Sequence, residues 1–255
     1  MSGPRAARTA LFTLLVLLAG PPGLVSAAQA ADPCDAPAEL TAATDPLRHA
    51  ARAIAKRAAL RILVIGTASS TQGGTSAPTS TYPVLLAEAL RRHLPEVAVT
   101  VETRGGRGLV AAELETLLET ALAEFRPDLV IWQTGTVDAV NGVDSDAFAA
   151  SLRAGIDRAA ASHADLILMD QQFSRLGRAT VNYTPYRQAI ATVANATDAL
   201  LLRRYDLTRY WAETGQIDLE RAPRADWQRS ADQLHACLAK ALSKAILAGV
   251  REAKR

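Results

Sequence analysis

Five short apolar segments alternate with longer helical patterns along this chain, and this alternation constrains its fold more than any other feature. The apolar segments, at residues 61–66, 97–102, 128–133, 165–170 and 199–203, are predicted to be strands. Helices are predicted at residues 46–60, 82–93, 109–125, 146–162, 186–196 and 231–248. Because such alternation is typical of a parallel sheet covered on both faces, we predict an α/β fold. It should have three layers, α/β/α, around a parallel sheet of about five strands.

The first 30 residues have the pattern of a signal peptide. Arg5 and Arg8 precede an apolar run at residues 11–18, which is too short to span a bilayer. An A-x-A cleavage pattern follows at residues 28–30. Gly-Pro-Pro-Gly at residues 20–23 breaks the helix early, which favours a signal peptide over a membrane anchor. We therefore expect a periplasmic or secreted bacterial protein with no stable membrane span after cleavage.

The rest of the chain is predicted to form one domain, with a leader and helix at residues 31–59 and the sheet within residues 60–255. A net charge of +2 argues against a nucleic-acid partner. Cys34 and Cys237 are the two cysteines of the chain. Because two cysteines can pair in an oxidising compartment, a Cys34–Cys237 disulfide is favoured over two free thiols.

Polar segments follow the predicted strands, and ligands of open parallel sheets bind beyond the carboxyl ends of the strands. The candidates in these segments are Ser69, Gly105, Gln133 and Gln172. A serine on a turn between strand and helix can expose its hydroxyl at this edge of the sheet, and glycines let a backbone approach a ligand closely. A plain polar loop or tight turn remains the alternative in each case.

Asp232 and His235 form an Asp-x-x-His pattern near the C-terminus. The carboxylate can orient the imidazole and leave its other nitrogen to accept a proton from a serine. A helix-capping Asp beside a surface His is the alternative. The four histidines are scattered and the two cysteines lie far apart, so no metal site is expected. No cofactor is expected either, since neither Gly-Lys-Ser/Thr nor G-x-G-x-x-G follows the first strand.

Taken in order, these segments resemble the SGNH/GDSL hydrolases over about residues 61–247. Ser69 corresponds to the block I serine, and Gly105, or Gly106 one residue later, to the block II glycine. Gly135 and Asp138 match the ends of the block III Gly-x-Asn-Asp, and Asp232 and His235 match the Asp-x-x-His of block V. The first block is similar to that of exported bacterial members with Gly-Ser-x-Ser. The resemblance implies an SGNH-hydrolase, flavodoxin-like catalytic domain over residues 60–255.

The resemblance also implies a serine esterase. Ser69 would be the nucleophile, with Ser70 as the alternative, and Asp232 and His235 would complete the triad. The N–H groups of Ser69 and Gly105 would stabilise the oxyanion. Two positions depart from the family: Ala68 replaces an aspartate, and Val137 replaces the block III asparagine, whose amide would be a further oxyanion donor. Gln133, Gln171 or Gln172 could substitute for it.

The polar loops favour a small-molecule or carbohydrate ester with a short acyl group, acetyl above all, over a long lipid chain. If a sugar hydroxyl replaced water, the same site would be an O-acetyltransferase. The alternative from another class is a catalytically weakened SGNH-fold protein that binds glycans or assists polysaccharide O-acetylation.

Overall fold

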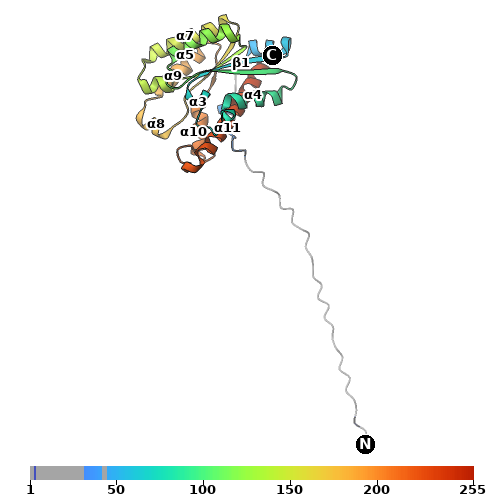
Figure 1. Cartoon of the computed structure of the whole chain (residues 1–255), viewed down its shortest axis with the longest axis vertical. Coiled ribbons are helices and arrows are strands. Elements are labelled where there is room, and N and C mark those ends of the chain that lie inside the picture. Colours follow the sequence, from blue (N-terminus) through green and yellow to red (C-terminus); the bar gives the residue numbers. More distant parts are fainter. Residues whose placement is uncertain (1–2, 4–31, 42–44) are drawn as a thin grey trace. The chain divides into compact units, whose positions relative to one another are not determined.

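The computed structural model describes residue 3, residues 32–41 and residues 45–255. The predicted signal peptide, apart from Gly3, lies outside the described residues. Residues 32–255 form one compact unit, drawn in Figure 1 in colours from blue to red. Within the described part of the chain, no helix is both long and apolar enough to cross a membrane.

The central sheet has five strands, all parallel, in the order β2-β1-β3-β4-β5. The strands are β1 (Ala59–Gly66), β2 (Ala98–Gly105), β3 (Leu129–Gln133), β4 (Asp165–Met169) and β5 (Leu200–Leu202). β1 pairs with β2 on one side and with β3 on the other, so the strand order reverses at β1. The carboxyl ends of β1 and β3 therefore form the place where a ligand is expected in such a sheet.

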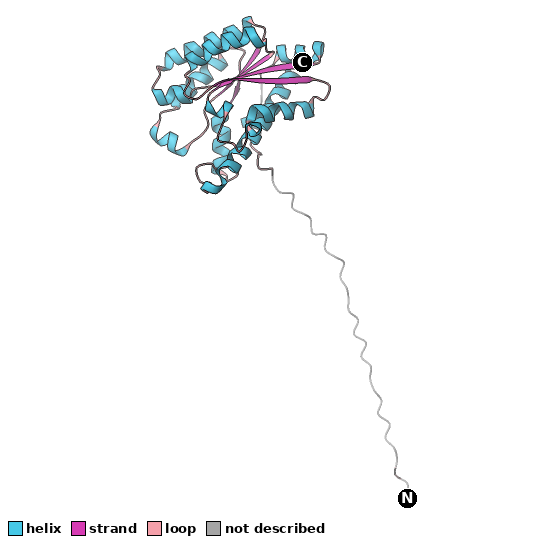
Figure 2. Ribbon diagram, viewed as in Figure 1, coloured by secondary structure: helices cyan, strands magenta, loops and turns pink. Residues whose placement is uncertain are grey.

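Helices cover both faces of the sheet, and the predicted three-layer α/β/α architecture is confirmed (Figure 2). One face packs against α5 (Ala111–Phe125), α7 (Ser145–Ala161) and α9 (Thr184–Asn195). The other packs against α2 (Arg48–Arg57), α4 (Tyr82–His93) and α11 (Trp227–Glu252). Successive residues of β1 point to opposite faces: Leu63 and Ile65 join the first cluster, and Ile62 and Val64 the second. Because both faces are covered, both sets of side chains are apolar, and the strands read as continuous apolar runs.

Short helices fill the segments around the carboxyl edge of the sheet. They are α1 (Ala38–Thr41), α3 (Ala68–Thr71), α6 (Thr136–Asn141), α8 (Arg175–Thr180) and α10 (Arg204–Glu213), with 3₁₀ turns η1 (Pro78–Ser80) and η2 (Arg224–Asp226). The sequence pattern predicts none of them. In α10 the apolar residues Leu207 and Trp211 are fully buried, but the intervening charged residues hide the helical period.

Strand β2 continues three residues beyond its predicted end at residue 102. Thr103, Arg104 and Gly105 pair with Val64, Ile65 and Gly66 of β1. Gly105 has φ +137°, and a Cβ placed there would lie 1.8 Å from the carbonyl oxygen of Gly66. The segment that follows the predicted strand is therefore partly strand itself, because a glycine without a side chain lets the two backbones approach.

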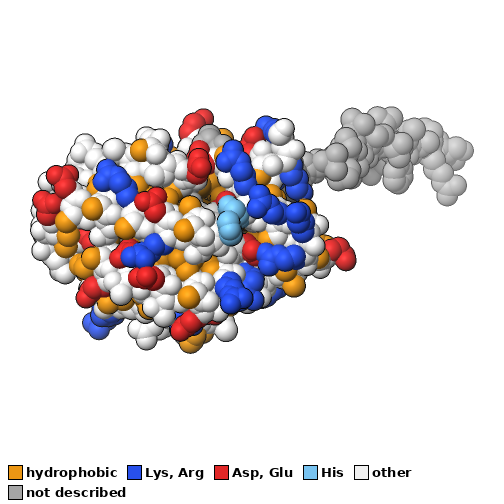
Figure 3. Space-filling view, turned by 90° about the horizontal axis from the view of Figure 1, so that it is seen from above, with side chains coloured by type: hydrophobic (Ala, Val, Ile, Leu, Met, Phe, Trp, Pro, Cys, Tyr) orange, Lys and Arg blue, Asp and Glu red, His pale blue; other side chains and the backbone are white. Residues whose placement is uncertain are grey.

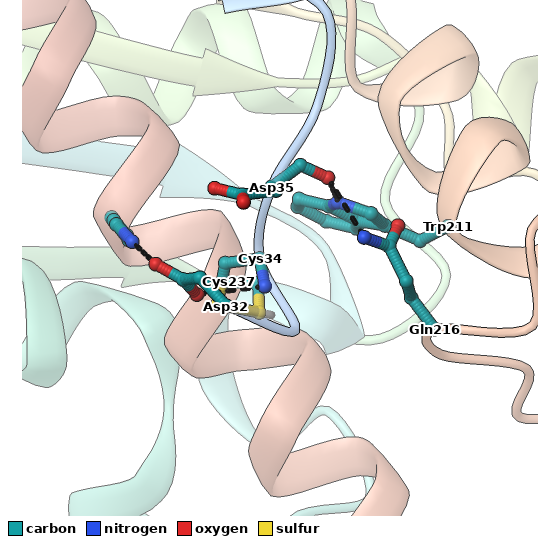
Figure 4. Close-up of a disulfide and its surroundings, with 7 residues drawn as sticks. Asp32, Cys34, Asp35, Trp211, Gln216 and Cys237 are labelled. Atoms are coloured by element: carbon teal, nitrogen blue, oxygen red, sulfur yellow. Dashed lines mark hydrogen bonds and ion pairs between the residues drawn. A yellow bond between two sulfur atoms is a disulfide. The ribbon is translucent and has the colours of Figure 1, made fainter. Parts of the chain in front are cut away.

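The predicted disulfide between Cys34 and Cys237 is present and joins the N-terminal segment to α11 (Figure 4). Two side chains beyond β5 reinforce this attachment. Trp211 Nε1 donates to the carbonyl oxygen of Asp35 at 3.1 Å, and Gln216 Nε2 donates to the same oxygen at 3.2 Å. Asp32 also pairs with Lys240 of α11. Residues 32–35 are thus held against α10 and α11.

The surface carries charges of both signs. Seen from above, acidic side chains lie scattered among apolar and neutral atoms, and basic side chains gather beside a histidine on one part of the face (Figure 3). This mixture agrees with a chain of net charge +2.

Candidate active site

A pocket of about 440 Å³ opens at the carboxyl edge of the sheet. Its lining comes from the segments that follow β1, β2, β3, β4 and β5. Three predicted site residues take part, Ser69, Gln133 and Gln172, together with Val137 and Arg204. The pocket therefore lies where the rule for parallel sheets places a ligand, beyond the carboxyl ends of the strands.

Ser69 lies in α3, the short helix that follows β1, and its side chain is half-buried in the pocket lining. Its hydroxyl donates to Gln133 Oε1 at 3.2 Å. Arg204 Nη1 donates to the same hydroxyl oxygen at 3.1 Å. The serine that was predicted as nucleophile is thus held between an amide oxygen and a cation.

Gln133 is the last residue of β3 and is buried. Besides the Ser69 hydroxyl, its Oε1 accepts from the Thr67 N–H at 3.0 Å, the Thr67 hydroxyl at 3.1 Å and the Ser70 hydroxyl at 3.1 Å. This one oxygen therefore fixes the whole turn that carries Ser69. That Gln133 also binds substrate or an oxyanion stays a prediction.

Ser70, the alternative nucleophile, is only 2% exposed. Its hydroxyl lies 2.8 Å from the hydroxyl of Tyr82, which is completely buried in α4. Burial raises the pKa of Tyr82 to about 12, so this phenol is neutral. Ser70 is absent from the pocket lining, and its position favours a packing role that leaves Ser69 as the accessible hydroxyl.

His235 lies in α11 and is 2% exposed. Its Nδ1 accepts a hydrogen bond from the N–H of Tyr82 at 2.9 Å, which assigns the ring proton to Nε2. The imidazole lies against Gly73, where a Cβ would come within 2.3 Å of Cε1 and Nε2. Burial lowers the pKa of His235 to about 4, the charge of Arg204 acts in the same direction, and Asp232 opposes them. His235 is therefore a neutral imidazole at neutral pH.

Asp232 lies one helical turn before His235, but its carboxylate binds elsewhere. It accepts from the N–H of Ser76 at 2.8 Å and from the Ser76 hydroxyl at 2.5 Å. Among the described residues, Ser69, His235 and Asp232 form no hydrogen bonds with one another. His235 and Asp232 both contact the segment that follows Ser69: His235 contacts Gly73 and Tyr82, and Asp232 contacts Ser76. The hydrogen bonds of a catalytic triad are not formed, and the triad stays a prediction.

Two family positions hold the scaffold together. Gly105 lets the backbone of β2 lie close to Gly66 of β1. In the segment that follows β2, the pocket is lined by Arg107 and Gly108. Asp138 is 1% exposed and its Oδ1 accepts from the N–H of Ala111 at 2.8 Å, so it joins α6 to the start of α5. Oxyanion binding by the Gly105 N–H stays a prediction.

Arg204 is a pocket residue that the sequence pattern does not single out. It is 1% exposed, and its Nη2 donates to Gln172 Oε1 at 2.6 Å. It comes directly after the fifth predicted strand, so the carboxyl-edge rule that selected Ser69 and Gln172 could have selected it as well.

Several solved structures share this fold. TesA has a TM-score of 0.55, with 20% identity over 71% of this chain and 99% of its own. A catalytic mutant of Axe2, an acetylxylan esterase from Geobacillus stearothermophilus, has a TM-score of 0.59, with 19% identity over 73% of this chain and 94% of its own. LAE5, an alpha/beta hydrolase enzyme from the metagenome of Lake Arreo, Spain, has a TM-score of 0.56, with 18% identity over 74% of this chain and 96% of its own. Identities this low show a common fold.

The family of the chain follows from comparing its sequence with known proteins and families. No curated protein matches the chain. The model of the non-GDSL lipase-like family matches residues 33–252, which include the whole sheet, the pocket and α11. The description of this family agrees with the SGNH/GDSL resemblance and with Ala68 at the position of the usual block I aspartate. The chain belongs to the non-GDSL lipase-like family and is thus an ester hydrolase of the SGNH/GDSL type.

Proposed function

We propose that this chain is a secreted serine esterase that removes short acyl groups, acetyl above all, from carbohydrate. The observation that carries this proposal is Ser69, the serine hydroxyl that lines the pocket at the point where the strand order reverses. The polar and cationic residues Arg107, Gln172 and Arg204 in the lining favour an oxygen-rich substrate. Axe2, which has the same fold, is described as an acetylxylan esterase, and this supports the same class of substrate.

The reaction is acyl transfer to Ser69 and then to water. Ser69 Oγ forms a bond to the ester carbonyl carbon, the carbonyl electron pair moves to its oxygen, and the Ser69 proton passes to His235. Collapse of this intermediate breaks the bond to the alcohol, which leaves with that proton. Water attacks the acyl-enzyme in the same way and releases the acid. Asp232 orients His235 and stabilises the imidazolium.

These steps require a different hydrogen bond at His235 from the one in the structure. Nδ1 must exchange the Tyr82 N–H for the Asp232 carboxylate, which moves the ring proton to Nδ1 and leaves Nε2 free to accept from Ser69. Asp232 must in turn leave Ser76. Gly73 and Gly74, with φ of +55° and +73°, provide the backbone freedom for this shift. Catalytic hydrogen bonds often form only when substrate is bound.

The nucleophile is tested by comparing Ser69→Ala with Ser70→Ala in turnover of p-nitrophenyl acetate. We expect Ser69→Ala to abolish turnover, since it removes the attacking oxygen. Ser70→Ala should keep most of the activity, because Ser70 lies outside the pocket lining. Loss of activity in Ser70→Ala alone would show that the nucleophile is Ser70.

The catalytically weakened alternative is separated from the enzyme by a fluorophosphonate probe. We expect labelling of Ser69 in the folded protein and none in Ser69→Ala. A folded protein that stays unlabelled and binds acetylated oligosaccharides without turnover would support the glycan-binding alternative.

Export is tested by fractionating cells that make the full chain. We expect the protein outside the cytoplasm, and a full-length cytoplasmic protein would contradict the proposal.

A further inference from the structure

Arg204 places a positive charge in the lining of the pocket. It is the first residue of α10, just beyond the carboxyl end of β5. Its Nη1 contacts Ser69 Oγ at 3.1 Å, and its Nη2 contacts Gln172 Oε1 at 2.6 Å. Both acceptors are neutral, so these hydrogen bonds leave the charge of the guanidinium uncompensated.

No described carboxylate forms an ion pair with Arg204, and its Nε lacks a hydrogen-bond partner among the described residues. Asp170 is the carboxylate whose charge acts on it, but Asp170 accepts from the N–H of Tyr205 at 2.8 Å and lies 3.5 Å from Arg187 Nε. Burial lowers the pKa of Arg204 below its ordinary value. Because a buried charge without an ionic partner is costly, an anion that forms in the pocket would be strongly stabilised here.

Val137 lies in the same pocket lining as Arg204, on α6. In the SGNH/GDSL resemblance, its position is that of an asparagine whose amide donates to the oxyanion, and valine has no donor. We propose that Arg204 supplies the oxyanion donor that Val137 cannot supply, a role that rests on the proposed esterase reaction.

The position of Arg204 fits the chemistry of that reaction. When Ser69 Oγ bonds to the acyl carbon, the carbonyl oxygen takes up the electron pair of the broken π bond and becomes anionic. This oxygen lies two bonds from Ser69 Oγ, within the reach of a guanidinium that already contacts Oγ. The donor is preorganised, since packing and Gln172 hold it in place before substrate arrives.

The decisive variant is Arg204→Met, which keeps much of the side-chain volume and removes the charge. We expect kcat for p-nitrophenyl acetate to fall by about 10²–10³, the usual effect of losing one oxyanion donor, while KM changes by less than about threefold because the neutral ester is bound as before. The matched control is Arg203→Met. Arg203 is the neighbouring arginine, it is exposed and pairs with Asp206, and its loss should leave kcat unchanged.

A rescue experiment separates oxyanion binding from simple positioning of Ser69. Val137→Asn restores the family donor, so it should raise kcat of Arg204→Met at least tenfold while leaving the wild-type kcat almost unchanged. Folded variants that show no rescue would assign Arg204 a positioning role and overturn the proposal. If Arg204→Met does not fold, Arg204→Leu takes its place as a second variant without charge or donor, with at least a tenfold loss of kcat expected and an unchanged kcat overturning the proposal.

The outcome also distinguishes this inference from the esterase proposal. If the wild-type protein showed no turnover that depends on Ser69, both the esterase proposal and the role of Arg204 would be overturned. Full kcat in folded Arg204→Met, with activity still lost in Ser69→Ala, would overturn the role of Arg204 alone.

Discussion

Individual residues of the site differ in how far the sequence predicts them. Ser69 could be predicted, because a serine after the first strand of a parallel sheet must lie at its carboxyl edge. The orientation of His235 could not, since it depends on a hydrogen bond from Tyr82, 153 positions earlier in the chain. Arg204 has no motif around it, and its importance follows only from burial beside Ser69.

The burial of His235 has a consequence for the pH dependence of catalysis. A general base acts in its deprotonated form, so activity rises with pH through its pKa. Because burial and Arg204 lower the pKa of His235 to about 4, we expect kcat/KM for p-nitrophenyl acetate to rise with a midpoint near pH 4, well below the 6.5 of an ordinary histidine. Activity should then stay level through pH 7.

The same pKa shift affects stability. Between pH 6.5 and about 4 the unfolded chain binds a proton that the folded His235 excludes, so the free energy of unfolding should fall as the pH is lowered through this range. His235→Gln removes this contribution and is the control in urea titrations. An activity midpoint at or above pH 6.5 would show that His235 does not react from its buried environment.

At the scale of elements, the strands and long helices were predictable and the short helices were not. A strand covered on both faces is a continuous apolar run, as in β3, where all five residues are buried. The short helices α3, α6 and α10 depend on contacts made only in the folded chain. Helix α6 shows this, because its Asp138 contacts the N-terminus of α5, 27 positions earlier in the chain.

The pairing of β1 with β2 at the edge of the site depends on Gly105. We expect Gly105→Ala to lower the free energy of unfolding by about 3 kcal/mol, because it combines a strained positive φ with a clash against a backbone oxygen. The φ of Gly105 is +137°, and the added Cβ would lie 1.8 Å from the Gly66 carbonyl oxygen. Urea denaturation followed by circular dichroism measures the change.

Gly106→Ala is the matched control for this prediction. A Cβ at Gly106 would have its nearest neighbour, Leu109 Cδ1, at 4.0 Å, so a change within about 0.5 kcal/mol is expected. Equal losses in the two variants would contradict the close approach at Gly105. The comparison also tests which of the two glycines occupies the structural position of block II.

At the scale of the whole molecule, the N-terminal segment and the last helix are joined by a disulfide, which was predictable only from the oxidising compartment expected for this chain. Cys34 and Cys237 are 203 positions apart. Cys237 is fully buried, in a cluster with Leu207, Trp211 and Leu234. It lies two residues after His235, so the bridge ties the end of the chain that carries the candidate base to residues 32–35.

Removal of this disulfide should destabilise the fold as a whole. A bridge that closes so long a loop restricts the unfolded chain strongly, so we expect the double variant Cys34→Ala/Cys237→Ala to lose about 2–5 kcal/mol in free energy of unfolding. Alanine is used because a serine hydroxyl at the buried position 237 would add a separate cost. Wild-type protein unfolded with dithiothreitol should match the double variant, and dithiothreitol should have no effect on the variant itself. Equal urea midpoints for oxidised wild-type protein and the double variant would show that hydrogen bonds from Trp211 and Gln216 to Asp35 suffice to hold the segment.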